Sequence, residues 1–411
     1  MTPELDQMTE MTPTRAEGEK IMAAFTPRMG RRYANGRNTD NGPGAHKAVS
    51  VLSPYIRRRL VLEQDAVAAA IAAHGAEEAE KFVQEVIWRG YFKGWLERRP
   101  QIWDSYRRGL ADDLAALERD RRLRRDVERA CAGQTGLECF DAWATELVDT
   151  GYLHNHARMW LASYLVHLRK VHWHVGASWM LAHLLDGDLA SNHLSWQWVA
   201  GTGSTKPYLF NADNVARYAP EAWHSPGTVI DTSYETLDAV ARSSKTLLGH
   251  APTQHSRLAA TEEPALFTAP PAHLGFTAPQ PHALVGKDVW LVHPWSLGRR
   301  PPGVPADALC ISIVVAECHQ PTPWSALRWG FVGQRMADMG SSRWFAPAES
   351  MCAALAGARC VQLVDDMHLG TFPQQLRALA HRIHPKPLLF EAVDRLCPSF
   401  SGWWKRTRIA A

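Results

Sequence analysis

The spacing of apolar residues constrains the fold of this chain more than any other feature. From residue 63 to residue 218, apolar residues recur every three or four positions and seldom alternate with polar ones, which is the pattern of amphipathic α-helices. The clearest helical segments span residues 63–74, 77–97, 117–130, 139–149 and 155–168. Ser53-Pro54 has the form of a helix N-terminus, with proline in the first turn. We therefore expect an all-α domain over residues 21–220, preceded by a disordered N-terminus at residues 1–20.

A second pattern begins at residue 287, where short apolar runs alternate with helical periodicity. The predicted strands are DVWLVH (288–293), LCISIVVA (309–316), CVQLVDD (360–366) and PLLFEA (387–392), and the predicted helices are 326–339, 348–356 and 373–383. This alternation indicates a parallel, doubly wound sheet, without a GxGxxG or Walker-type loop. Residues 221–286, rich in Pro, Ala, Ser and Thr, predict a linker with one short helix near 234–248. The expected fold class is α plus α/β, a helical domain followed by a smaller Rossmann-like α/β domain at residues 287–411.

The composition narrows the class of protein. A chain of 411 residues with 46% apolar residues has enough material for two domains, and a net charge of +3 is too small to indicate nucleic-acid binding by itself. Neither a signal-peptide pattern in residues 1–20 nor an apolar run long enough for a membrane span is present, so we expect a cytoplasmic monomer without membrane contact. The seven cysteines are dispersed and include no Cys-x-x-Cys pair, which favours reduced thiols over disulfides and predicts no metal site.

Three segments carry a resemblance to a known family: EVIWRGYF (85–92), GYLHNHARMW (151–160) and DGDLASNHLSWQW (186–198). They resemble the FAD-binding domain of the photolyase/cryptochrome family, whose members repair ultraviolet damage in DNA with light or sense blue light. The resemblance covers roughly residues 30–220 and implies FAD as the cofactor and UV-damaged DNA as the partner. The family usually places an α/β antenna-binding domain first. Here VWLVHPWSLGRRPP and RWGFVGQRMADM faintly resemble parts of that domain, so residues 287–411 are either a permuted antenna-like domain or an unrelated one.

The resemblance implies a set of FAD contacts. Ser50, Leu52 and Ser53 match a loop that holds the phosphates, although Val49 replaces the threonine of the family. Read without the family, Ser-Pro is a helix cap and Asp-Gly-Asp is a turn. The remaining positions that match FAD contacts are Tyr33, Arg89, Asn155, Arg158, Asp186, Asp188 and Asn192.

The resemblance also implies residues that carry the chemistry. Asn192 stands where the family places the residue facing the reactive flavin nitrogen, and asparagine there is typical of photolyases rather than cryptochromes. Glu85 matches a residue that hydrogen-bonds the damaged base. The other positions that match the lesion pocket of cyclobutane dimer photolyases are Arg37, Trp88, Asn155, Met159 and Trp198. The alternative is that both tryptophans are core residues and that Glu85 lies on a solvated helix face.

Tryptophans imply a route for electrons to the flavin. Trp196 and Trp173 match the proximal and middle members of the electron-transfer chain of the family, and Trp103 or Tyr106 is a candidate for the distal member. For DNA phosphates we expect contacts from the basic run 57–59, because it adjoins the implied site. The basic run 121–125 is interspersed with acids, so we interpret it as a solvated helix face.

Together these positions imply a deoxyribodipyrimidine photolyase, a carbon–carbon lyase in which photoexcited reduced FAD splits cyclobutane pyrimidine dimers. One alternative is a cryptochrome-like blue-light photoreceptor that keeps the flavin site without repair. The other is a light-independent DNA-binding or scaffolding protein that has retained the fold. The sequence identifies no antenna chromophore.

Overall fold

The computed structural model describes residues 11–202, 206–244, 265–280, 284–340, 342–367, 380–391, 393 and 395–407. These residues divide into two compact units. Unit 1 contains the described residues at 28–50 and 74–244, and unit 2 contains those at 11–27, 51–73 and from 265 onward. Each unit is therefore assembled from segments that are distant in the sequence.

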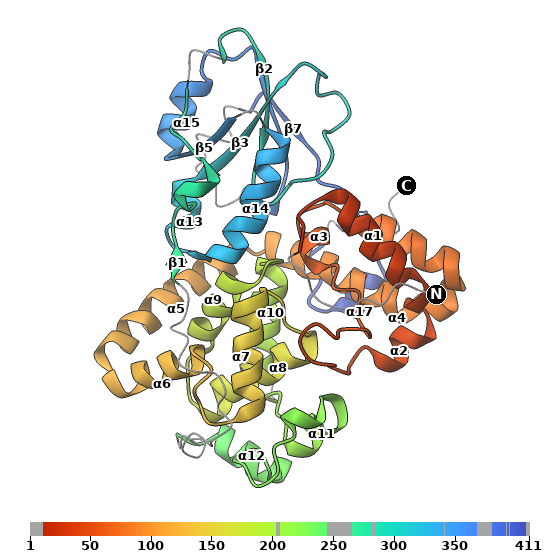
Figure 1. Cartoon of the computed structure of the whole chain (residues 1–411), viewed down its shortest axis with the longest axis vertical. Helices are drawn as coiled ribbons and strands as arrows, with labels where there is room; N and C mark the ends of the chain where they lie inside the picture. Colours follow the sequence, from red (N-terminus) through yellow and green to blue (C-terminus); the bar gives the residue numbers. More distant parts are fainter. Residues whose placement is uncertain are drawn as a thin grey trace. The chain divides into compact units, whose positions relative to one another are not determined.

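Unit 1 is helical, as the periodicity predicts. Its helices are α2 (Arg31–Gly36), α5 (Pro100–Arg119), α6 (Arg121–Cys131), α7 (Glu138–Thr150), α8 (Asn155–Ser163), α9 (Trp173–His183), α10 (Leu189–Ala200), α11 (Ala212–Tyr218) and α12 (Tyr234–Ala241). A π-helical turn, Tyr164–Leu168, continues α8, and a short 3₁₀ turn, Glu221–Trp223, precedes α12. Helices α8, α9 and α10 pack against one another, and α5 packs on α9 (Figure 1).

Large aromatic side chains form the core of unit 1. Trp143 and Trp160 are fully buried with ring centroids 5.2 Å apart, and Phe140 packs on Tyr164 at 4.7 Å. Burial of such side chains contributes about 1.5–3 kcal/mol each, which far exceeds the helix propensity of the segments that carry them. The core therefore fixes α7, α8 and the π-helical turn.

Helix α4 (Glu63–Glu97) contains a break at Gly75, whose φ of 75° lies in the left-handed region. Glycine adopts this conformation without the penalty that a Cβ atom imposes. The break separates the segments predicted at 63–74 and 77–97. It also falls where the chain passes from unit 2, which ends this segment at residue 73, to unit 1.

Unit 2 contains a five-stranded parallel sheet in the order β5-β3-β2-β6-β7. The strands are β2 (Asp288–Val292), β3 (Leu309–Val315), β5 (Ser342–Ala346), β6 (Cys360–Val364) and β7 (Arg382–His384). The remaining elements are α1 (Arg15–Phe25), α3 (Ser53–Arg57), α13 (Ala316–His319), α14 (Ala326–Met339), α15 (Ala348–Leu355), α17 (Phe400–Trp404), the 3₁₀ turn Ala272–Leu274 and the antiparallel pair β1 (Leu266–Phe267) with β4 (Trp324–Ser325). Helices α14 and α15 flank the sheet (Figure 1).

The strand order gives the sheet a switch point between β2 and β6, because the chain runs outward from β2 in one direction and from β6 in the other. In sheets of this kind, ligands bind beyond the carboxyl ends of the strands at the switch point. Here the end of α3 and the residues that follow it fill this place. Arg57 and Arg59 both reach Asp366, at 3.3 and 2.8 Å, and Arg58 donates to the Pro294 carbonyl at 3.0 Å.

This arrangement corrects the expected role of the basic run 57–59. Arg57 and Arg58 are buried, with 2% and 0% exposure, and the Arg59 guanidinium is held by Asp366 and the carbonyl of Asp365. Buried guanidiniums paired in this way cannot contact DNA phosphates, so that expectation is wrong. The other basic run is exposed as expected, and Arg124 pairs there with Glu118 and Glu128.

Two predicted elements need correction, and one strand was not predicted. The described residues 387–391 form no strand, and Phe390 packs on Trp403 and Trp404 of α17. The final strand is β7, which occupies residues that were predicted to end a helix at 373–383, and residues 371–379 lie outside the described residues. Strand β5 was not predicted, since only two of its five side chains are buried.

The predicted domain boundaries also change. Residues 15–20 are helical rather than disordered, because Thr14 caps α1 and Gly18 packs on Tyr55 and Val61. The predicted linker at 221–286 contains the expected helix as α12, but its last part belongs to unit 2 through β1. None of the seven cysteines, all of which are among the described residues, forms a disulfide. Among the described helices, none has both the length and the apolarity to cross a bilayer.

Candidate functional site

Unit 1 contains a cavity that is partly open to solvent. Helices α4, α8, α9 and α10 and the loop before α10 line it. Eight predicted site residues meet there: Arg89, Asn155, Arg158, Met159, Asp186, Asp188, Asn192 and Trp196. Because these residues lie on separate segments of the chain, the fold brings together positions that only the resemblance had linked.

The cavity has five further lining residues that the sequence reasoning missed, which are Ala162, Met180, Ser191, Ser195 and Val199. A signal for three of them was present in the sequence. Ser191, Ser195 and Val199 lie three or four residues from the motif positions Asp188, Asn192 and Trp196 along α10. This spacing marks one face of a helix, so the motif positions could have been extended along it.

Two ion pairs set the charge of the cavity wall. The Arg158 guanidinium lies 3.0 Å from Asp186, and its Nε donates to the Leu153 carbonyl at 2.8 Å. Asp188 accepts from Arg89 at 3.4 Å and from the backbone N–H of Ser191, which it caps at the start of α10. A guanidinium held at two points keeps its plane fixed, so Arg158 is preorganised to face a ligand.

Lys93 adds a second cation beside Asp188. Its Nζ lies 3.8 Å from Oδ2 of that carboxylate, one helical turn after Arg89 on α4. Residues four apart share one face of a helix. Two cations therefore lie beside a carboxylate that is only 3% exposed.

Asn192 is buried on α10 and points its amide at the neighbouring helix. Its Nδ2 donates to the Ala177 carbonyl of α9 at 2.9 Å. The oxygen of an asparagine amide accepts hydrogen bonds and its nitrogen donates them, so this hydrogen bond fixes which of the two atoms faces α9. The amide is thereby held in one orientation at the cavity wall.

The Trp196 indole forms an apolar part of the wall. It is 2% exposed and lies against the backbone of Gly176 on α9. Trp173, at the start of α9, packs on Tyr106 at 5.6 Å and on His193 at 5.2 Å. Trp173 does not line the cavity, but both tryptophans lie on the face where α9 and α10 meet.

Aromatic rings continue from Trp173 toward α5. Tyr106 stacks on Trp103 at 5.0 Å and meets His193 at 4.7 Å. Burial lowers the pKa of His193 to about 4, with a smaller contribution from His174. The two candidates for a distal member of the electron route, Trp103 and Tyr106, therefore lie in one stack rather than on alternative paths.

The predicted lesion residues of α4 lie outside the lining. Glu85 faces Arg37 across a gap of 3.5 Å, and burial raises the pKa of its carboxyl although Arg37 opposes the shift. Trp88 packs on Tyr91 and Phe92. On α10, Trp198 is 51% exposed beside Tyr208. The expected alternative of a buried core position therefore does not hold for Trp198.

The predicted phosphate loop divides between the units. Tyr33 packs edge-on against Phe82 in unit 1, which also contains Ser50, whereas Leu52 and Ser53 begin α3 in unit 2. Val51 has a φ of 53°, a costly conformation for a β-branched residue. Strain of this kind is found at ligand-binding loops, where the surrounding structure enforces it.

Comparison with known proteins gives matches over part of the chain. Residues 82–242 match the family model for the FAD binding domain of DNA photolyase. The deoxyribodipyrimidine photo-lyase of Streptomyces griseus is 34% identical over 219 residues, which cover 50% of this chain and 44% of that protein. The Synechococcus protein of the same name is 30% identical over 200 residues, covering 44% and 40%. The chain thus spans less than half the length of these relatives.

Solved structures are similar in part. A bacterial class III photolyase from Agrobacterium tumefaciens superimposes with a TM-score of 0.42 and 22% identity, over 60% of this chain and 54% of that one. The match at residues 82–242 includes α5 to α12, the cavity and both of its ion pairs. Through this region, the chain is similar to the FAD binding domain of DNA photolyase and to the two photo-lyases named above.

Proposed function

We propose that this protein binds FAD in the cavity of unit 1 and uses light to split cyclobutane pyrimidine dimers in UV-damaged DNA. The observation that carries the proposal is the convergence of Arg158, Asp186, Asp188, Asn192 and Trp196 on one cavity. These are the positions that the resemblance assigns to the flavin and to its supply of electrons. A monomeric, cytoplasmic enzyme without membrane contact remains part of the proposal.

The residues of the cavity fit FAD chemically. A buried hydroxyl, Ser191 Oγ, has no hydrogen-bond partner among the described residues, and it lines the cavity at the N-terminal turn of α10. Arg89 and Lys93 supply positive charge for a pyrophosphate, whereas Met180 and Trp196 offer apolar surface for a ring system. A ligand with a planar ring at one end and phosphates at the other suits this division.

Reduced FAD, when bound, supplies one electron to the dimer under light and recovers it after the ring has split, so no net redox change occurs. The protein residues orient and shield this chemistry. Arg158, oriented by Asp186, would stabilise negative charge on the ring, and the Asn192 amide cannot release a proton as a carboxylic acid does. Trp196 and Trp173 would pass electrons toward the cavity.

The lesion would be recognised beside the flavin. Asn155 and Met159 line the same cavity on α8, and Met159 offers a soft contact to a base. Burial raises the pKa of Glu85, which brings its carboxyl closer to the protonated form that donates a hydrogen bond to a pyrimidine carbonyl. A dimer is poorly stacked and costs less to flip out of the duplex than normal bases.

The test is light-dependent repair of an oligothymidine that carries cyclobutane dimers, measured as the recovery of thymine absorbance. The purified full chain with reduced FAD should repair in blue light and not in the dark. Glu85→Gln should lower the rate of repair, and Glu78→Gln is the matched control. Glu78 pairs with Arg31 of α2 at 3.0 Å, as Glu85 pairs with Arg37, but it does not match a lesion contact.

Each outcome separates the candidate functions. Repair that depends on light and on Glu85 supports the photolyase. A protein that binds and photoreduces FAD without repair would be a photoreceptor. A protein that retains no flavin would contradict the proposal at its first step and favour a scaffolding role.

A further inference from the structure

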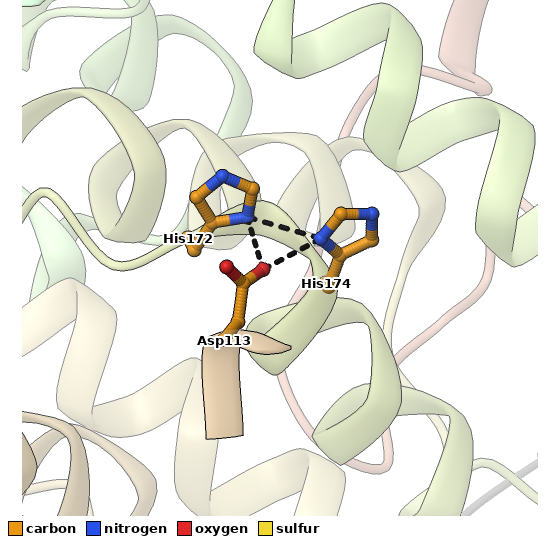
Figure 2. Close-up of side chains that lie close together, drawn as sticks. All are labelled: Asp113, His172 and His174. Carbon is orange, nitrogen blue, oxygen red and sulfur yellow. Dashed lines mark hydrogen bonds and ion pairs between the residues drawn. The ribbon is translucent and has the colours of Figure 1, made fainter. Parts of the chain in front are cut away.

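We propose that Asp113, His172 and His174 form a binding site for a divalent transition-metal ion, with Zn²⁺ as the best fit. Asp113 lies on α5, His172 caps α9 and His174 lies in its first turn. One carboxylate oxygen and both imidazole Nδ1 atoms converge on a single point (Figure 2). None of the three lines the flavin cavity, so the site is distinct from it.

The distances suit a small cation after a slight expansion. Asp113 Oδ2 lies 2.5 Å from His172 Nδ1 and 2.6 Å from His174 Nδ1, and the two nitrogens are 3.1 Å apart. Tetrahedral Zn²⁺ with Zn–N bonds of about 2.0–2.1 Å holds its ligand atoms about 3.3 Å apart. The set must open by less than about 1 Å, which His172, 56% exposed, has the freedom to do.

When both Nδ1 atoms carry protons, the two rings can donate to the same Asp113 oxygen. In the tautomers with both protons on Nε2, two nitrogen lone pairs and a carboxylate oxygen converge on one point. A cation at the common point turns all three lone pairs into attractive ligands.

The packing around His174 holds the site together. A Cβ atom at Gly109 would lie 2.5 Å from Cε1 of His174, so only glycine allows the ring to reach the backbone of α5. Gly109 and Asp113 are four residues apart and share one face of that helix. The side chains of His174 and Asp113 are only 13% and 19% exposed, whereas His172 opens to solvent. This leaves room for water as a fourth ligand, the usual arrangement of a three-ligand zinc site.

The ligand types define the ion. Two imidazoles and one carboxylate favour Zn²⁺, Co²⁺, Ni²⁺ or Cu²⁺, whereas Mg²⁺ and Ca²⁺ select oxygen ligands.

The tag-free full chain, stripped with a chelator, should bind one equivalent of Zn²⁺ by calorimetry. Co²⁺ should give a visible ligand-field spectrum that Zn²⁺ abolishes and excess Mg²⁺ does not.

Two substitutions test the ligands, and one serves as the control. Asp113→Asn and His172→Ala should each weaken Zn²⁺ binding at least tenfold. Asp112→Asn removes an exposed carboxylate one position away and should bind like the unaltered protein. Far-ultraviolet circular dichroism verifies the fold of each variant. Absence of saturable binding, or equal affinity in Asp113→Asn, His172→Ala and Asp112→Asn, would overturn the proposal.

Discussion

The Trp196 indole rests on the backbone of Gly176, where a Cβ atom would lie 2.4 Å from Cη2 of the ring. Two helices, α9 and α10, thereby approach each other at the wall of the cavity in unit 1. The same indole lines the cavity, so a change in the packing of Trp196 on Gly176 would also change the proposed binding site.

Gly176→Ala should therefore push Trp196 out of place. We expect a loss of about 1–3 kcal/mol in the free energy of unfolding, typical of overpacking, and a lower content of bound flavin. Gly94→Ala is the matched control, because this helical glycine has nothing within 4 Å of an added Cβ. It should be neutral or slightly stabilising. Equal unfolding energies for the two variants would contradict the proposed contact.

Asn192→Asp should make stability depend on pH in a new way. The carboxylate would face the Ala177 carbonyl, which now accepts from the amide at 2.9 Å, so its protonated form is favoured and its pKa is raised. The variant should lose roughly 1–3 kcal/mol relative to the unaltered protein at about pH 8 and much less at about pH 5. Urea unfolding at both pH values measures the difference, and a pH-independent loss would rule out this hydrogen bond as the cause.

Arg158→Gln should weaken flavin binding and stability together. It leaves Asp186, 4% exposed, without the guanidinium that lies 3.0 Å away, and breaking a buried pair costs about 3 kcal/mol or more. Arg124→Gln breaks exposed pairs and should cost less than about 1 kcal/mol. Flavin absorbance per mole of protein and thermal unfolding provide the two readouts. Full flavin retention in Arg158→Gln would remove this residue from the proposed site.

Trp173→Phe should slow photoreduction of the bound flavin, because it removes the proposed middle member of the electron route, which packs on Tyr106. The control is Trp179→Phe, which lies on the same helix and is equally buried, with 7% exposure for both tryptophans. It lies outside the stack with Tyr106 and His193, and its ring meets His183. Transient absorption under anaerobic light measures the rate. A rate in Trp173→Phe that equals that of Trp179→Phe would exclude this route.

Two buried histidines predict a loss of stability in mild acid. Burial lowers the pKa of His154 to about 3 and that of His193 to about 4, so both are neutral in the folded protein and bind protons on unfolding. Their contribution is complete above pH 6.5 and is lost as the pH falls below it, by about 2 kcal/mol each between about pH 7 and pH 5. Asp40 acts in the opposite direction, since burial raises its pKa to about 6.

The measurement is therefore a difference between variants. The free energy of unfolding of His193→Gln should fall less steeply between neutral and mildly acidic pH than that of the unaltered protein. His224→Gln, which removes a histidine outside this core, should follow the unaltered protein. Parallel curves for all three proteins would show that His193 is not the titrating group.

Local patterns predicted most of the elements and little of their assembly. Runs such as 288–293 and 309–316 became β2 and β3 because their side chains are buried on both faces of a parallel sheet. The units could not be predicted in this way. Arg57 and Asp366 are 309 residues apart, and no periodicity within either segment indicates that they meet.

The same limit applies to the sites. Family motifs identified eight of the cavity residues, because each motif lies in one short segment. The cluster at Asp113 was missed, and the expectation of no metal site came from cysteine spacing alone. Its His-Trp-His part was visible in the sequence, but the carboxylate stands 61 residues away from His174. The antenna-like identity of residues 287–411 stays a prediction.

The arginines at the switch point of the sheet act as an internal competitor. Since Arg57 and Arg59 are tethered to the same unit as Asp366, they face it at an effective concentration in the millimolar range or above. A nucleotide-like anion at this edge would therefore have to replace the Asp366 carboxylate as the partner of the two guanidiniums. Any ligand there competes with a contact that the unit itself supplies.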